Sequence, residues 1–129
     1  LSELKRLITA FVLLGISVAL SIWSNIIFEK KMINLSDSLS ILIECSESCS
    51  KEELSEKAEL LVFQWETCSP LLHSLILHEG TDEIEQNITS LPLVIEYGTD
   101  EEFKSKCIET INRIDNLIKA EKLTVENIF

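Results

Sequence analysis

Charge is missing from one long stretch of this 129-residue chain, which has neither a charged residue nor a proline between Leu7 and Phe28. A helix over residues 7–28 is as long as the ~30 Å hydrocarbon core of a bilayer. Charged residues border the stretch on both sides: Lys5 and Arg6 before it, and Glu29, Lys30 and Lys31 after it. We therefore expect residues 7–28 to form a membrane-spanning helix.

The same stretch allows two alternatives. A cleaved signal peptide would use Lys5 and Arg6 as its basic region and Ala19-Leu20-Ser21 as its cleavage site. A buried helix of a soluble protein would need the rest of this short chain to surround it on all sides, which the chain can hardly do. The apolar run continues to Phe28, beyond the usual length of a signal peptide, and Trp23 suits a membrane–water interface. Both features favour an uncleaved anchor.

The orientation of the span in the membrane is predicted from the charged residues on its two sides. Lys5 and Arg6 on one side balance Lys30 and Lys31 on the other, so the positive-inside rule decides little. A short N-terminal lead with basic residues is typical of a signal-anchor. We expect residues 1–6 to lie in the cytoplasm and residues 29–129 to form one domain outside the membrane.

A second absence is that of Lys and Arg between Lys57 and Lys104, an interval with ten carboxylates in a chain of net charge −11. Such a surface repels nucleic-acid phosphates and anionic lipid headgroups, so nucleic-acid binding is not expected. The domain should stand away from the headgroups or meet a basic partner. The simplest interpretation is a solvated acidic face that keeps the domain soluble.

Alternation with period two is also missing, so we expect no β-sheet. Apolar residues instead recur at spacings of three and four, which is typical of amphipathic helices. The sequence predicts an all-α fold, in which the transmembrane helix continues into a small antiparallel bundle of three to four helices over residues 29–129. The expected inward-facing rows are Phe28, Met32, Leu35, Leu39, Leu42, Ser46 and Cys49; Leu54, Ala58, Leu61, Trp65 and Cys68; Ile84, Ile88, Leu91 and Ile95; and Phe103, Cys107, Ile111, Ile114 and Ile118.

Helix ends follow from capping residues. Ser50-Lys51-Glu52-Glu53 and Thr99-Asp100-Glu101-Glu102 match the capping box, in which the hydroxyl accepts the third amide of the helix. Gly80 can end a helix in the left-handed conformation, and Thr81 can cap the next one. We expect the apolar C-terminal tail over 123–129 to dock on the bundle.

At two places the sequence allows either a continuous helix or a break. Asn34 to Ser38 contains residues that favour a turn, although the apolar row passes through it without glycine or proline. Pro70 either kinks one long helix, which the preserved register favours, or begins a new helix capped by Ser69.

Several segments resemble one bacterial family. They are the apolar span ending in Ser21-Ile22-Trp23, the central Trp65, the run from His78-Glu79 to Asp82-Glu83-Ile84-Glu85, and the ending EKLTVENIF over 121–129. Over nearly the whole chain they are similar to the domain-of-unknown-function family forty-three sixty-three, found mostly in Gram-positive, Clostridia-like organisms. The resemblance implies a small helical protein anchored at its N-terminus. It implies no activity and no catalytic residue.

Two groups of residues are candidate metal ligands. Cys45 and Cys49 with His73 and His78 have the residue types of a tetrahedral zinc site, although their spacing matches no standard zinc finger. The second group places an imidazole beside carboxylates, which suits a divalent cation or an acid–base pair. Its members are His78, Glu79, Asp82 and Glu83. The alternative is that these residues only complement helix dipoles.

The four cysteines allow three disulfide pairings. Within an intact helix the pair Cys45–Cys49 is geometrically poor, whereas Cys68 and Cys107 lie on two rows that both face the core. If a disulfide forms, we expect Cys68–Cys107. Free thiols in the core are the simpler interpretation.

Small residues in the span are candidates for helix packing in the membrane. Gly15 and Ala19 are four residues apart, and Ser17 and Ser21 add hydroxyls. Such residues let transmembrane helices approach closely and form hydrogen bonds.

Catalytic motifs are absent as well: the sequence has no phosphate-binding glycine loop, no nucleophile elbow and no HExxH. We therefore expect no enzyme and no cofactor. The sequence favours a non-enzymatic interaction or structural module that sits in the lipid bilayer and docks on another membrane or envelope protein. An extracytoplasmic sensor of divalent cations or metals is the alternative, and a homo-oligomer remains open.

Overall fold

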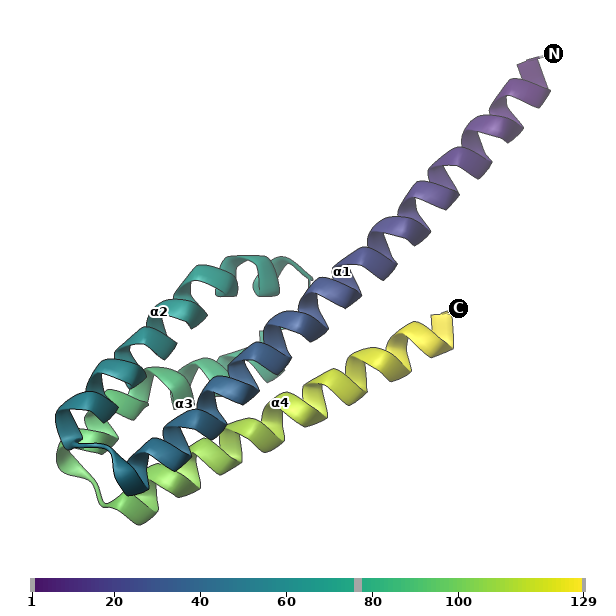
Figure 1. Ribbon diagram of the computed structural model, residues 1–129. Helices are drawn as coiled ribbons and strands as arrows, with labels where there is room; N and C mark the ends of the chain where they lie inside the picture. The colour runs from purple at the N-terminus through teal and green to yellow at the C-terminus, as the bar shows by residue number, and fades with distance from the viewer. Residues whose placement is uncertain (1, 76–77, 129) are drawn as a thin grey trace.

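The computed structural model describes residues 2–75 and 78–128, which form four α-helices and no strand (Figure 1). The helices are α1 (Ser2–Ser48), α2 (Lys51–Leu75), α3 (His78–Tyr97) and α4 (Asp100–Ile128). The predicted all-α fold is confirmed.

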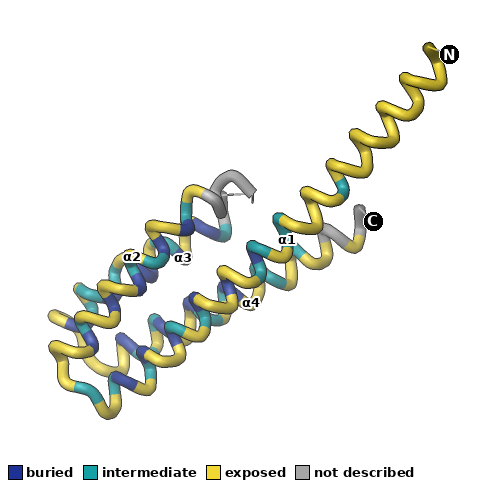
Figure 2. The backbone as a smooth tube through the Cα atoms, turned by 45° about the horizontal axis from the view of Figure 1, so that its top comes forward, coloured by how far each residue is buried: buried dark blue, intermediate teal, exposed yellow. Residues whose placement is uncertain are grey.

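Helix α1, with 47 residues, is the longest element and has two parts. Its first part extends alone from the rest of the molecule and is exposed almost throughout (Figure 2). Its second part packs into the bundle through Phe28, Met32, Leu35, Leu39, Leu42 and Cys45. The predicted continuation of the span into the first helix of the bundle is therefore confirmed.

No turn interrupts α1 between Asn34 and Ser38. The Ser38 hydroxyl donates to the Asn34 carbonyl oxygen at 3.0 Å, and the Ser40 hydroxyl donates to that of Ser36 at 3.2 Å. Such bonds to the preceding turn satisfy serine hydroxyls inside a helix, where the same residues could otherwise form a cap.

The helices are arranged as a ring. Helix α1 lies beside α2 and α4, and α3 lies beside the same two helices, whereas in the diagonal pairs no Cα atoms of the described residues come within 8 Å of each other. Successive helices run in opposite directions, as in an up-and-down four-helix bundle (Figure 1). The connections at 49–50 and 98–99 lie at the end of the bundle that is far from the exposed first part of α1 (Figure 1). The C-terminus lies at the opposite end of the bundle, close to where α1 leaves it.

A single apolar core fills the ring. Trp65 and Phe103 are its largest fully buried side chains, and the Trp65 Nε1 donates to Glu85 Oε1 at 3.4 Å. The predicted rows on α2 and α3 are all buried. On α1, Cys45 faces the core in place of Ser46, and on α4 Thr110 is buried while Ile111 is only partly so. The Thr110 hydroxyl donates to the Lys106 carbonyl at 2.7 Å, which allows its burial.

Both expected hydroxyl caps are present. Ser50 Oγ accepts the amide of Glu53 at 3.2 Å, and Thr99 Oγ1 accepts that of Glu102 at 3.1 Å. These bonds set the first turns of α2 and α4.

The predicted break at Gly80 and Thr81 is wrong, because both residues lie in the first turns of α3. A Cβ on Gly80 would lie 2.8 Å from Leu117 Cδ1, so the missing side chain lets α4 approach α3. Pro70 lies within α2, which continues to Leu75, so no new helix begins there. For the expected docking of the tail, the side chains of Ile128 and Phe129 lie outside the described residues, and Leu123 is exposed.

Ion pairs join α4 to its neighbours. Lys104 Nζ lies 2.9 Å from Glu47 Oε1, Lys122 Nζ lies 3.0 Å from Glu29 Oε1, and Arg113 pairs with Glu83. The bond from Lys104 holds the pKa of Glu47 below its usual value. Exposed pairs of this kind add little stability.

Candidate interaction surface

The first part of α1 is an exposed apolar surface. An 18-residue apolar window in this helix is 0% buried, and α1 is the helix in the described part of the chain that is long and apolar enough to cross a membrane. Large side chains along it, including Phe11, Leu14, Leu20 and Trp23, are more than half exposed. The alternative of a soluble core helix wrapped by its own chain is therefore wrong.

The small residues of the span do not form one surface. Neighbouring residues of an α-helix are ~100° apart, so Ser17 and Ser21 lie about 200° round from Gly15 and Ala19. The Ser17 hydroxyl donates to the Leu13 carbonyl at 2.9 Å, within the same helix. No atom lies within 4 Å of a Cβ placed on Gly15. A helix packing on Gly15 and Ala19 would therefore leave the two serines on the opposite side.

The cysteines pair differently from the expectation. Cys45 and Cys49 form a disulfide with their Cα atoms 4.9 Å apart, and Cys68 and Cys107 are free and buried. Helix α1 ends at Ser48, so the premise of an intact helix through Cys49 fails. Cys68 and Cys107 belong to α2 and α4, a diagonal pair of the ring in which no Cα atoms of the described residues come within 8 Å, too far for a disulfide. Burial raises the pKa of Cys68 and raises that of Cys107 to about 12.

The candidate zinc ligands are not brought together. Cys45 and Cys49 lie at the end of α1 where α2 begins, and His73 lies about six turns further along α2, about 33 Å away. His78 begins α3, at the same end of the bundle as His73. The two cysteines and the two histidines therefore lie at opposite ends of the bundle.

The candidate acidic cluster is only partly described. The side chains of His78 and Glu79 lie outside the described residues. Asp82 is exposed, and the Glu83 carboxylate pairs with Arg113 on α4. Among the side chains that the structure describes, no group of three or more His, Cys, Asp or Glu could hold a metal ion.

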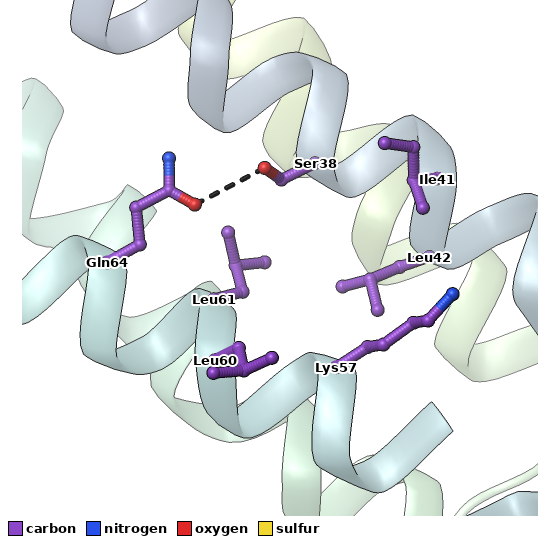
Figure 3. A pocket seen from close by; sticks show the side chains of 7 residues that line it. All are labelled: Ser38, Ile41, Leu42, Lys57, Leu60, Leu61 and Gln64. Carbon is purple, nitrogen blue, oxygen red and sulfur yellow. Dashed lines mark hydrogen bonds between the residues drawn. The ribbon is translucent and has the colours of Figure 1, made fainter. Parts of the chain in front are cut away.

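Two neighbouring hollows lie on the outside of the bundle between α1 and α2, and together they are called the α1–α2 groove. One has a volume of about 150 Å³ (Figure 3), the other has a volume of about 300 Å³, and Gln64 lines both. Ser38 Oγ also lies 3.3 Å from Gln64 Oε1 on the facing helix, so its single proton is shared between this oxygen and the Asn34 carbonyl. The lining of this α1–α2 groove comprises Lys31, Asn34, Ser38, Ile41, Leu42, Lys57, Leu60, Leu61, Phe63, Gln64, Thr67 and Cys68.

The edges of the α1–α2 groove are apolar and open to solvent. Ile41 is 54% exposed, Leu60 is 66% exposed and Phe63 is 67% exposed. Leu60 and Phe63 lie three residues apart on α2 and therefore on one side of that helix. Their burial by a partner would remove a large apolar area from water, which is the main driving force for association.

The charge of the groove is opposite to that of the molecule. Its lining includes Lys31 and Lys57 but no carboxylate, although the chain has 22 Asp and Glu against 11 Lys and Arg. By contrast, the lining of a hollow beside α3 and α4 has three carboxylates and one cation, Glu101, Glu102, Glu109 and Lys106. The groove is thus a distinct region of a predominantly acidic surface.

Sequence patterns did not identify this groove. The rows of period 3.6 point to the core, and the groove is built from the residues beside them on two helices. A signal was present on α2, where Leu60 and Phe63 are apolar although they lie off the inward row. Their partner on α1, Ile41, becomes a neighbour only once the two helices pack.

Comparisons of the chain with protein-family models, with curated proteins and with solved structures found no match. The resemblance to the bacterial family described above stays a prediction.

Proposed function

We propose that the protein is a single-pass membrane protein that holds an acidic helical bundle at the membrane surface and docks another membrane or envelope protein. It acts as a non-enzymatic interaction module, with its N-terminus in the cytoplasm and the bundle outside. The α1–α2 groove is the docking surface.

One observation carries this proposal. Helix α1 is exposed and apolar over its first part and enters the core at Phe28, without any break in the helix. A lipid bilayer is the solvent that suits the exposed part, because every backbone group is already bonded within the helix. The bundle is then attached rigidly to its anchor, which suits a protein that presents a surface to a neighbour.

Membrane insertion can be tested with charge. Arg at the centre of a span costs about 2.5–3.5 kcal/mol, so we expect the double variant Ile16→Arg, Leu20→Arg to leave the membrane fraction. The matched control is Ile33→Arg with Ile108→Arg, which changes exposed isoleucines of the bundle and should stay in the membrane fraction. Retention of the first variant after alkaline washing, or a mature chain that lacks the first 21 residues by mass spectrometry, would overturn the anchor.

Sidedness can be tested with a membrane-impermeant maleimide. The native cysteines are either bonded or buried, so they give little background. We expect Ser105→Cys on α4 to react in intact cells and Ser2→Cys to react only after permeabilisation. The reverse pattern would show that the bundle is cytoplasmic.

Docking can be tested in native membranes with a photocrosslinking amino acid. Placed at Leu60, at the edge of the groove, it should give a discrete crosslinked product. Placed at Leu93 on α3, which is 60% exposed, it should give none. Equal products at both positions, or none at either, would contradict a docking function for the groove.

A further inference from the structure

We propose that the partner of the α1–α2 groove is an amphipathic helix with one apolar face flanked by carboxylates. This inference rests on the proposed docking function and adds the chemistry of the partner. It opposes the expectation from overall composition, which favours a basic partner for so acidic a chain.

The shape of the groove favours a helix. Its lining extends along α1 from Lys31 to Leu42, which is about 17 Å or three helical turns. Two antiparallel helices form its sides, and a third helix can lay an apolar ridge between them. Leu60 and Phe63 from α2 and Ile41 from α1 provide apolar contacts for such a ridge (Figure 3 shows Leu60 and Ile41).

A lysine lies in each of the two hollows of the groove, which favours carboxylates on the partner helix. Lys57 lines the part around Ile41, and Lys31 lines the part nearer the free part of α1. Among the described residues neither lysine forms an ion pair, whereas Lys104, Arg113 and Lys122 each do. Burial raises the pKa of Cys68, which lines the same part of the groove as Lys31, and the positive charge of Lys31 partly opposes that rise.

Electrostatics also distinguishes an acidic helix from two other possible partners of the groove, a basic helix and a second copy of the chain. A basic helix is attracted by the long-range field of the molecule, but at the groove itself it would meet two lysines and no lining carboxylate. A second copy of the chain brings net charge −11 against −11. An acidic amphipathic helix on a partner of lower net charge is repelled less than a second copy would be, and its carboxylates meet the two lysines at the groove.

The test is a library of displayed helical peptides about three turns long, with a fixed leucine ridge. The flanking positions are randomised among Glu, Gln and Lys, and the target is the full chain in non-ionic detergent. We expect at least tenfold enrichment of Glu over Lys among binders. The long-range field of the molecule alone would enrich Lys, so the two explanations give opposite results.

Matched variants locate the binding. With Lys31→Glu and Lys57→Glu together the enrichment should shift from Glu to Lys, and with Lys119→Glu on α4 it should not change. Leu60→Asp should weaken a selected peptide at least tenfold, and Leu93→Asp less than twofold. Retained helicity of each variant by circular dichroism shows that the bundle is folded.

Enrichment of Lys, an enrichment unchanged by the two groove lysines, or the same binders on Leu60→Asp would overturn the proposed partner chemistry. Self-association of the full chain that is abolished by Leu60→Asp would assign the groove to a second copy instead. A photocrosslink at Leu60 in native membranes together with Lys-rich binders would retain the docking function and reject only the acidic helix. Loss of that crosslink would reject both.

Discussion

Gly98 lies where α3 ends, at a point where its α-carbon approaches the backbone of the preceding turn. A Cβ there would lie 2.8 Å from the carbonyl oxygen of Val94 and 2.7 Å from Glu102 Oε2. At Gly80 the equivalent close contact is the terminal methyl group of Leu117, which can rotate away. The two glycines therefore differ in whether backbone or a flexible side chain must move.

We expect Gly98→Ala to lower the free energy of unfolding by about 1–2 kcal/mol, because the helix end must shift. Gly80→Ala should change it by less than about 1 kcal/mol, since the displacement of Leu117 is offset by the better helix propensity of alanine. Urea unfolding of the full chain in detergent, followed by circular dichroism, measures both. Equal losses for the two variants would contradict this distinction.

The Cys107 thiol gives a pH dependence. Burial raises its pKa from an ordinary value of 9.0 to about 12. Above pH 9 the unfolded chain loses this proton while the folded chain keeps it, so the unfolded state binds fewer protons and stability falls as pH rises. The loss extends from pH 9 to about pH 12, with a slope of at most about 1.4 kcal/mol per pH unit.

Cys107→Ala should therefore be less stable than the parent at pH 8, because it leaves a small cavity, yet lose stability less steeply above pH 9. Unfolding free energies at a series of pH values give the two slopes. Identical slopes would show that Cys107 does not titrate in this window.

At the scale of the elements, much of the fold could be predicted from the sequence because each helix buries a row of period 3.6. The rows on α2 and α3 and the hydroxyl caps at Ser50 and Thr99 depend only on local residues. Gly80 was misassigned because its lack of a side chain serves contact with α4, which no local pattern shows. The Cys45–Cys49 disulfide and the α1–α2 groove were missed for a related reason, since both depend on where helices end and how they pack.

The cap of α4 can be tested alone. Thr99→Ala removes the oxygen that accepts the Glu102 amide and should lower the free energy of unfolding by about 1 kcal/mol. Thr89→Ala is the matched control, because that hydroxyl donates to the carbonyl oxygens of Glu85 and Gln86 within α3 and caps no helix. Chemical denaturation of the two variants measures the difference, and a control as destabilised as the cap variant would argue against capping.

The disulfide at the end of α1 should add little to stability. Cys45 and Cys49 are four residues apart, so closing this loop restricts the unfolded chain by about 2 kcal/mol, against about 4 kcal/mol for a bridge from Cys68 to Cys107. We expect the reduced chain to keep its helicity and to lose at most about 2 kcal/mol. The double variant Cys45→Ala, Cys49→Ala should not respond to reductant. Loss of the fold on reduction would contradict this estimate.

For the whole molecule, the net charge of −11 and an isoelectric point near 4.5 keep copies of the bundle apart at neutral pH. As pH falls towards 4.5 the carboxylates are protonated and this repulsion is lost. We expect the full chain in non-ionic detergent to associate near pH 4.5 and to be dispersed at pH 7.5, as measured by light scattering. Equal particle sizes at both values would show that apolar contacts alone set the assembly state.

Because α1 is a single uninterrupted helix, its geometry determines how far the α1–α2 groove lies from residues 7–28 and on which side of the helix axis it lies. If residues 7–28 lie in the bilayer, as proposed, its lining on α1 begins about 5 Å and ends about 20 Å beyond Phe28 along the helix axis. Steps of seven from Ile41 lead back to Asn34, Ile27 and Leu20, and each step turns by only about 20° around the helix. Rotation of the proposed anchor about its own axis would therefore turn the groove by the same angle, so the side on which a neighbouring protein meets the anchor and the side on which it meets the groove are linked.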